Sequence, residues 1–278
     1  MSGSLDGFKL VSTKKGQHRR KAKNNQLKTF LRQSGTDSGE ACCRTLIAKL
    51  SASEADIQQS EFFTDCFETV GPALLGIERI VCLGLGRFTE CSTARYQLAF
   101  IRCLRDKFLP GLRGQFFDPV FGPSEIEVLL SLGETVLEEN LEGKYCADCR
   151  TLFYLPHCPK QIVNNVLWSN WQSDRLGNVT LISNSFGSIV NNNPHRLLQT
   201  SAGYIVRAAD FFHEIPLKNT FRFGDIFNDT SLHHLPLGAT FPTEVWDNNE
   251  EPTYDTDDLE LISKELVRQL VLSTKEKL

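Results

Sequence analysis

Short apolar runs and stretches with helical periodicity alternate along the middle of the chain. Five runs are predicted to be strands, at residues 79–83, 115–117, 135–137, 151–155 and 179–183. Three stretches between them are predicted to be helices, at residues 92–108, 124–132 and 159–168. Because strand and helix alternate between Ile77 and Phe212, the pattern indicates crossover connections and a mostly parallel sheet. The predicted fold is α/β: a three-layer, doubly wound, Rossmann-like domain.

The same pattern sets the boundaries of this α/β domain at residues 45 and 243. A helix is predicted over residues 45–70, which residues 51–54 can break in two, and Gly71-Pro72 then interrupts the chain before the first strand. Residues 221–227 are predicted to add a last strand. A chain of 278 residues that is 41% hydrophobic can bury one sizeable core.

The two ends of the chain carry opposite charges, although the net charge is only −4. Residues 1–44 are predicted to be a flexible basic tail, because residues 14–28 hold seven Lys or Arg and no acid. Residues 244–278 are predicted to be an acidic linker followed by an amphipathic helix at 259–272. The basic run is interpreted as a weak contact for nucleic acid or importin, and a merely solvating terminus is an equal alternative.

No segment approaches the roughly 20 apolar residues that a membrane-spanning helix requires, and Met1-Ser2-Gly3-Ser4 does not begin a signal peptide. We therefore expect no membrane contact and a cytoplasmic protein, with the nucleus as a second location. The nine cysteines are odd in number and scattered, which in a reducing compartment predicts free thiols rather than disulfides.

Ligands of open parallel sheets bind beyond the carboxyl ends of the strands, so the residues that follow each strand are the candidates for a site. Gly84 and Gly86 follow the first strand and lead into a helix, which fits an anion or a nucleotide. Thr89 stands where the third glycine of a dinucleotide fingerprint would be. Asp118 follows the second strand and is the candidate partner of a ribose hydroxyl. A tight turn that needs small residues is the equal structural alternative.

His157 and Cys158 place an imidazole and a thiol before a predicted helix, whose N-terminus can lower the pKa of a thiol. His157 is a candidate general base or hydrogen-bond donor, and Cys158-Pro159 is similar to short motifs in which a thiolate binds haem iron. The alternative is a histidine that only satisfies local backbone groups.

Asn184 and Ser185 follow the fifth strand, where they can orient a polar ligand or cap the next helix. His233-His234 is interpreted as part of a solvated loop, with a metal site as the lesser alternative. Cys146-x-x-Cys149 cannot share zinc with His157 and Cys158, because the five extended residues between the pairs span roughly 17 Å. No metal site is predicted.

Four motifs at the strand ends together resemble the Sensitivity-to-Red-Light-Reduced family. They are CLGLGRF at residues 82–88, DPVF at 118–121, FYLPHC at 153–158 and SNSF at 183–186. The resemblance spans roughly residues 80–233, and Ser183 departs from it where a glycine is expected. Carried over by position, it implies a functional surface made of Gly84, Gly86, Asp118, His157, Cys158, Asn184 and Ser185.

The resemblance implies a regulator of circadian clock input and, in animal members, of haem biosynthesis and core clock gene expression. It implies no reaction, so a non-catalytic regulator that binds a small ligand or protein partner is favoured. Two alternatives remain open on the residues alone. One is a transferase that uses S-adenosylmethionine or another nucleotide at Gly84, Gly86 and Asp118, and the other is a haem sensor acting through Cys158 or His157.

Overall fold

The computed structural model describes residues 39–236, 238–247 and 249–254. The basic run at 14–28 and the predicted closing helix at 259–272 lie outside the described residues. None of the described helices is both long enough and apolar enough to cross a membrane.

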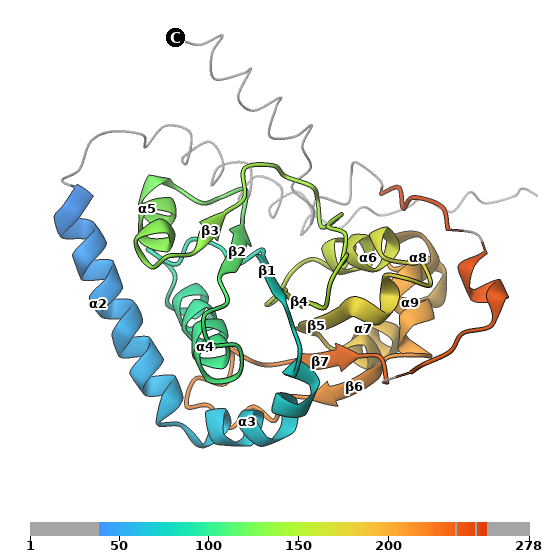
Figure 1. Ribbon diagram of the computed structural model, residues 1–278, viewed down its shortest axis with the longest axis horizontal. Coiled ribbons are helices and arrows are strands. Elements are labelled where there is room, and N and C mark those ends of the chain that lie inside the picture. Colours follow the sequence, from blue (N-terminus) through green and yellow to red (C-terminus); the bar gives the residue numbers. More distant parts are fainter. Residues whose placement is uncertain (1–38, 237, 248, 255–278) are drawn as a thin grey trace, which may run out of the picture.

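A seven-stranded sheet with the order β3-β2-β1-β4-β5-β7-β6 runs through the middle of the domain (Figure 1). Its strands are β1 (Arg79–Leu83), β2 (Gly114–Phe117), β3 (Thr135–Val136), β4 (Thr151–Tyr154), β5 (Val179–Asn184), β6 (His213–Pro216) and β7 (Thr230–His234). β1 to β5 pair in parallel, whereas β7 runs antiparallel to both of its neighbours, β5 and β6. The predicted α/β class and the mostly parallel sheet are therefore confirmed.

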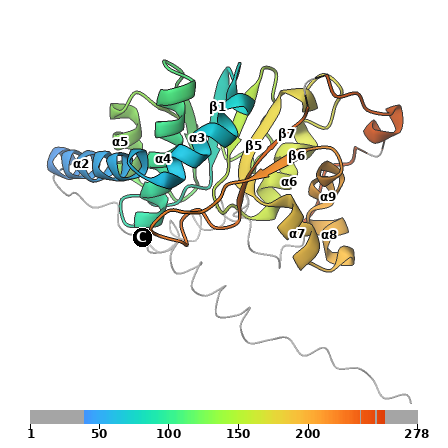
Figure 2. The same cartoon turned by 90° about the horizontal axis from the view of Figure 1, so that it is seen from below.

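Helices cover both faces of this sheet and complete the three layers (Figure 2). The first group is α2 (Gly39–Gln58), α3 (Glu61–Leu74), α4 (Ser92–Phe108) and α5 (Pro123–Ser131). The second group is α6 (Lys160–Ser169), α7 (Phe186–Asn192), α8 (His195–Ser201) and α9 (Gly203–Ala209), with short 3₁₀ turns at Leu176–Asn178 and Thr243–Trp246. The three short helices α7 to α9 were not predicted, because none is long enough to show a clear period.

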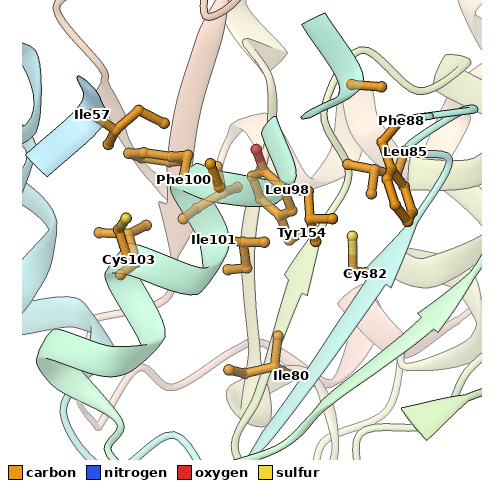
Figure 3. Close-up of a cluster of buried hydrophobic side chains, with 14 of the residues drawn as sticks. Ile57, Ile80, Cys82, Leu85, Phe88, Leu98, Phe100, Ile101, Cys103 and Tyr154 are labelled. Atoms are coloured by element: carbon orange, nitrogen blue, oxygen red, sulfur yellow. The ribbon is translucent and has the colours of Figure 1, made fainter. Parts of the chain in front are cut away.

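The two helix groups form separate cores because successive strand residues point to opposite faces. Ile80 and Cys82 of β1 belong to the core beneath α2 to α5, whereas Val81 and Leu83 belong to the core beneath α6 to α9. Figure 3 shows the first core, where Cys82, Leu98 and Tyr154 lie together between β1, α4 and β4. A strand buried on both faces has the continuous apolar sequence that predicted β1 and β4.

The N-terminal helix prediction was wrong about where the chain breaks. The break falls between Gln58 and Glu61, where the Ser60 hydroxyl accepts a hydrogen bond from Phe63 N at 3.1 Å and caps α3. α2 also begins at Gly39, within the segment that the sequence assigns to the tail. Gly71 and Pro72 lie inside α3, which continues to Leu74. An N-cap serine fixes the start of the helix that follows it, so the second helix begins after Ser60 rather than after the small residues at 51–54.

The predicted last strand at residues 221–227 was also wrong. These residues connect β6 to β7, and Phe221 and Phe227 pack beside Phe62 of α3. Their apolar character serves the core beneath α2 to α5 rather than a sheet. The actual final strands are β6 and β7, and both contain histidine.

Candidate functional site

All seven candidate residues lie at one edge of the sheet. β1, β2, β4 and β5 are parallel, so the loops after them begin side by side. The chain winds from β1 toward β2 and β3 on one side and from β4 toward β5 on the other, so the winding reverses between β1 and β4. Ligands of doubly wound sheets bind at this kind of switch point. Gly84 and Cys158 flank it directly.

Gly84 has a left-handed backbone, with φ of +67°, and it lies against the side chain of Cys158. A Cβ atom on Gly84 would overlap the Cys158 Sγ atom. Gly84 N also donates to Phe117 O at 3.3 Å, which joins the loop after β1 to the end of β2. The close approach that Gly84 allows is therefore made to a cysteine of the same chain.

Cys158 does not have the environment of a reactive thiolate. Its Sγ atom donates to Leu83 O at 3.1 Å, and the residue is only 8% exposed. Burial raises the pKa of this thiol, and the nearby Asp118 carboxylate raises it further. The expectation that the N-terminus of α6 lowers this pKa is wrong, because loss of hydration outweighs the helix dipole at this position.

Gly86 and Asp118 are joined by a hydrogen bond between neighbouring loops. Asp118 Oδ2 accepts from Gly86 N at 2.7 Å, and its Oδ1 accepts from Val120 N at 2.9 Å. Burial raises the pKa of Asp118, while these two backbone donors act in the opposite direction. Gly86 has φ of +81°, and a Cβ atom added to it would meet only Ala94 Cβ, at an ordinary contact distance of 3.9 Å, so its backbone conformation is what requires glycine.

A second buried acid, Glu125, fixes the rest of the loop after β1. Glu125 Oε2 accepts from Gly122 N at 3.0 Å, and its Oε1 accepts from the backbone and hydroxyl of Thr89. Arg87 lies 4.0 Å from the same carboxylate and 2.9 Å from Glu90. Thr89, which replaces the third glycine of a dinucleotide fingerprint, is thus held by an acid instead of opening a phosphate site. Sequence reasoning missed Glu125, because it lies within a helix.

His157 is the most exposed of the polar candidates and has an unusual backbone. Its φ is +51°, and its Nε2 atom lies 3.0 Å from Ile226 O in the connection between β6 and β7. A carbonyl accepts only from an N–H, so Nε2 carries a proton, and in the neutral imidazole the lone pair is then on Nδ1. Non-glycine residues in this conformation are strained and are concentrated at functional sites.

Asn184 and Ser185 belong to a separate polar group at the end of β5. Ser185 caps α7 by accepting from Ser188 N at 2.9 Å, which is the structural alternative predicted for it. Glu214 of β6 accepts from Gly187 N at 3.0 Å and from Ser231 Oγ at 2.8 Å. Burial would raise the pKa of Glu214, but hydrogen bonds from Ser185, Gly187 and Ser231 outweigh it and lower the pKa.

His233 lies inside the sheet rather than in a solvated loop, so that interpretation of the sequence was wrong. It is fully buried in β7, stacks on Phe186 with ring centroids 3.7 Å apart, and places Nε2 3.2 Å from Asn184 O. Burial lowers its pKa to about 4, although the nearby Glu214 carboxylate opposes the shift. Its Nδ1 atom is buried and has no hydrogen-bond partner among the described residues.

Six of the seven candidates therefore form two separate groups along one edge of the sheet, with contacts inside each group. Gly84, Gly86, Asp118 and Cys158 form the first, and Asn184 and Ser185 the second. His157 stands beside the first group in sequence and contacts Ile226. Asp229, which also has a left-handed backbone with φ of +52°, accepts a 3.4 Å hydrogen bond from Asn184 Nδ2. Two of the three non-glycine residues with positive φ in the described chain thus lie at this edge.

Comparison with protein families identifies one family along most of this domain. The SRR1 domain matches residues 57–234, which include β1 to β7 and every candidate residue. Among curated relatives, an SRR1-like protein of Drosophila melanogaster is 34% identical over 242 residues, covering 85% of each chain.

Two further relatives match over shorter stretches. An SRR1-like protein of Mus musculus is 44% identical over 134 residues, covering 48% of this chain and 54% of its own. Protein SENSITIVITY TO RED LIGHT REDUCED 1 of Arabidopsis thaliana is 32% identical over 150 residues, covering 50% and 54%. Among solved structures, the SAH-bound methyltransferase PaMTH1 of Podospora anserina is similar with a TM-score of 0.37 and 12% identity, covering 83% of this chain and 99% of that one.

Proposed function

The chain belongs to the SRR1 domain family, and on that premise we propose that it is a regulatory protein for clock-linked gene expression and haem production. It acts by binding a small ligand or a protein partner at the carboxyl edge of its sheet. A relative named for reduced sensitivity to red light supports a role in regulation. A non-catalytic role is favoured, because the hydrogen bonds of the edge acids Asp118 and Glu125 go to backbone and hydroxyl groups of neighbouring loops.

The single observation that carries this proposal is the exposed His157 at the switch point. Its Nε2–H is used by Ile226 O, which leaves the Nδ1 lone pair as an acceptor for a group outside the domain. The left-handed backbone holds the imidazole in place at an energetic cost of roughly 1–3 kcal/mol. The residues before and after His157 are buried in the domain, so they hold this exposed histidine in its left-handed conformation. A side chain fixed in this way is suited to recognition of a ligand or partner.

Complementation in cells that lack the protein tests the regulatory role. We expect the natural chain to restore transcript rhythm and haem content, and His157→Gly to restore neither while accumulating to the same level. His195→Gly, in the exposed helix α8, is the control and should restore both. Full rescue by His157→Gly would reject His157 as the recognition residue, and absence of any rhythm or haem defect in the deleted cells would reject the regulatory role.

A second candidate function is a transferase that uses S-adenosylmethionine. The switch point, the Gly84–Gly86 loop and Asp118 support a nucleoside ligand here. The buried acids Asp118 and Glu125 oppose a chain of phosphates at the same loop, because like charges repel strongly where water is scarce. They disfavour NAD and ATP and are compatible with a positively charged sulfonium.

Calorimetry separates these ligand classes on the purified chain. S-adenosylmethionine, NAD and ATP are each titrated into the natural chain and into Asp118→Asn. Heat with S-adenosylmethionine that is lost in Asp118→Asn would favour the transferase, and no heat with any of the three would reject it.

A haem sensor is a weaker alternative, because the Cys158 thiol is protonated and faces Leu83 O. His157 Nδ1 is the better iron ligand of the two. A haemin titration followed in the Soret band, repeated with His157→Gly, tests it.

The location proposed for the protein is the cytoplasm, with import into the nucleus through the basic run at residues 14–28. Replacing the seven basic residues of that run by glutamine in a fluorescent fusion tests the import step. Nuclear fluorescence that survives the replacement would exclude this run as the signal.

A further inference from the structure

Residues 243–247 and 249–254 form a strap that lies across helices α6 and α9. Trp171 Nε1 donates to Val245 O at 2.8 Å, and Tyr204 Oη donates to Glu250 O at 2.9 Å. Arg207 of α9 bonds to the same Val245 carbonyl and to Asp247 O, and its guanidinium stands 4.6 Å from the Trp171 ring centre. Side chains of the domain thus hold the main chain of the strap, in a segment that the sequence predicts to be an acidic linker.

The strap ends in a socket on α6 that receives the hydroxyl of Tyr254. Tyr254 Oη lies 2.7 Å from Asn165 Oδ1, 3.0 Å from Asn164 Nδ2 and 3.2 Å from Gln161 O. Two of these three partners are oxygen acceptors, so the socket requires the hydroxyl proton. Burial among these neutral groups raises the pKa of Tyr254, which keeps that proton in place.

We propose that Tyr254 is a phosphorylation site whose modification releases the strap from α6 and α9. A protein tyrosine kinase would transfer the γ-phosphoryl group of ATP to Tyr254 Oη. The new oxygen–phosphorus bond replaces the bond between the γ-phosphorus and the β,γ-bridging oxygen, ADP leaves, and the hydroxyl proton passes to the base of the kinase. The product carries a charge of about −1.5 to −2 and no hydroxyl donor.

The socket cannot accommodate this product. The Asn165 Oδ1 and Gln161 O atoms would face phosphate oxygens, which are acceptors too, and an acceptor next to an acceptor is repulsive. Two cations of the strap contacts already have other partners: Lys144 bonds to Glu251 and lies 3.6 Å from Glu142 Oε2, and Arg207 bonds to Val245 O and Asp247 O. Loss of the socket removes the anchor at Tyr254 and places a doubly charged group next to the remaining contacts of the strap at Val245, Asp247 and Glu250.

The sequence around Tyr254 matches the chemistry of a kinase substrate. Glu250 and Glu251 precede it, and Asp255, Asp257 and Asp258 follow within four residues. Kinases select substrates through complementary charge, and an acidic segment fits an enzyme with a basic substrate groove. No Lys or Arg lies between Glu244 and Glu260.

Release would uncover the side chains that now hold the strap: Trp171, Tyr204 and Arg207. Aromatic and arginine side chains are the residues that dominate the energy of protein interfaces. Phosphorylation would therefore exchange an internal contact for an open surface on the α6 and α9 face.

The test treats the full-length chain with ATP and a recombinant tyrosine kinase, maps the phosphate by mass spectrometry and follows amide hydrogen exchange. We expect phosphate on Tyr254 and at least tenfold faster exchange over residues 243–254, while β1 and β4 exchange as before. Tyr254→Phe is the matched control, because its exchange should not respond to kinase and ATP.

If the kinase leaves Tyr254 unmodified in the full chain, the same kinase is applied to a peptide of residues 244–264. An unmodified peptide would reject Tyr254 as a substrate for that kinase class and overturn the proposal. A modified peptide calls for phosphotyrosine introduced at position 254 during translation. Unchanged exchange over 243–254 in that phosphorylated chain would overturn the release, and faster exchange would support it.

Discussion

Gly84 and Cys158 are in direct contact across the switch point of the sheet. The side chain of Cys158 fits there only because residue 84 is a glycine. Gly84 has no Cβ, which leaves room for the Cys158 Sγ atom to reach Leu83 O. The cysteine fills the space between the ends of β1 and β4, so the two strand ends are packed against each other. This pair determines how closely any ligand approaches the backbone at that point.

Gly84→Ala is expected to destabilise the domain by about 3 kcal/mol, since it adds both a steric overlap and a left-handed alanine. Adding Cys158→Ala removes the overlap, because the Cys158 Cβ atom would lie 3.7 Å from the new methyl group. The double variant should therefore cost about 1–2 kcal/mol less than the sum of the single variants. Urea unfolding of the three variants measures this coupling.

Gly86→Ala is the matched control for this cycle. Its backbone is also left-handed, but the nearest atom to a new Cβ is Ala94 Cβ at 3.9 Å. We expect a cost of about 1 kcal/mol and no coupling to Cys158→Ala. Equal coupling at Gly84 and Gly86 would show that the contact with Cys158 is not the cause.

His157→Gly is expected to be more stable than His157→Ala by about 1 kcal/mol. Both variants lose the hydrogen bond to Ile226 O, but only alanine keeps the strain of a φ of +51°. At Arg196, within helix α8, the same pair of substitutions should show the reverse order. Thermal unfolding of the four variants provides the comparison, and alanine being the more stable at both positions would contradict the assigned backbone.

Cys158 is expected to resist alkylation in the folded chain, whereas Cys91 reacts. Cys158 is buried and its pKa is raised, while Cys91 is exposed at the N-terminus of α4. Iodoacetamide labelling at pH 8, followed by peptide mapping, should show at least tenfold faster modification of Cys91. The difference should vanish in denaturant, and comparable rates without denaturant would show that the edge opens.

His233 is expected to make the domain less stable as the pH falls from about 6.5 toward about 4. Its folded pKa, about 4, lies below the ordinary value of 6.5, so within this range the unfolded chain binds a proton that the folded chain does not. Stability is therefore full above pH 6.5 and declines on acidification, by on the order of 2 kcal/mol for this group.

Denaturant midpoints measured between pH 7 and pH 4 check this slope. Replacing His233 with glutamine should flatten it, whereas His195→Gln, at an exposed position on α8, should leave it unchanged. An identical slope in all three chains would assign the acid sensitivity to carboxylates alone.

The sequence determined the parts of this protein in which local pattern and burial coincide. β1 and α4 were predicted with their observed bounds, because a strand buried on both faces is continuously apolar and an amphipathic helix has a regular period. The placement of seven candidate residues at one edge followed from the parallel winding alone. The family resemblance rested on motifs at these same strand ends.

Tertiary structure alone decided what those residues touch. β7 is the polar sequence Thr-Ser-Leu-His-His, and it is buried only because Phe186, Asn184 and Glu214 come to it from other elements. Cys158 is a protonated, buried thiol because Gly84 leaves room for it. Its position before helix α6 in the sequence does not show this burial, and by itself it predicted a lowered pKa. Periodicity reports which face of an element is apolar, whereas the pKa and the partners of a side chain depend on atoms distant in sequence.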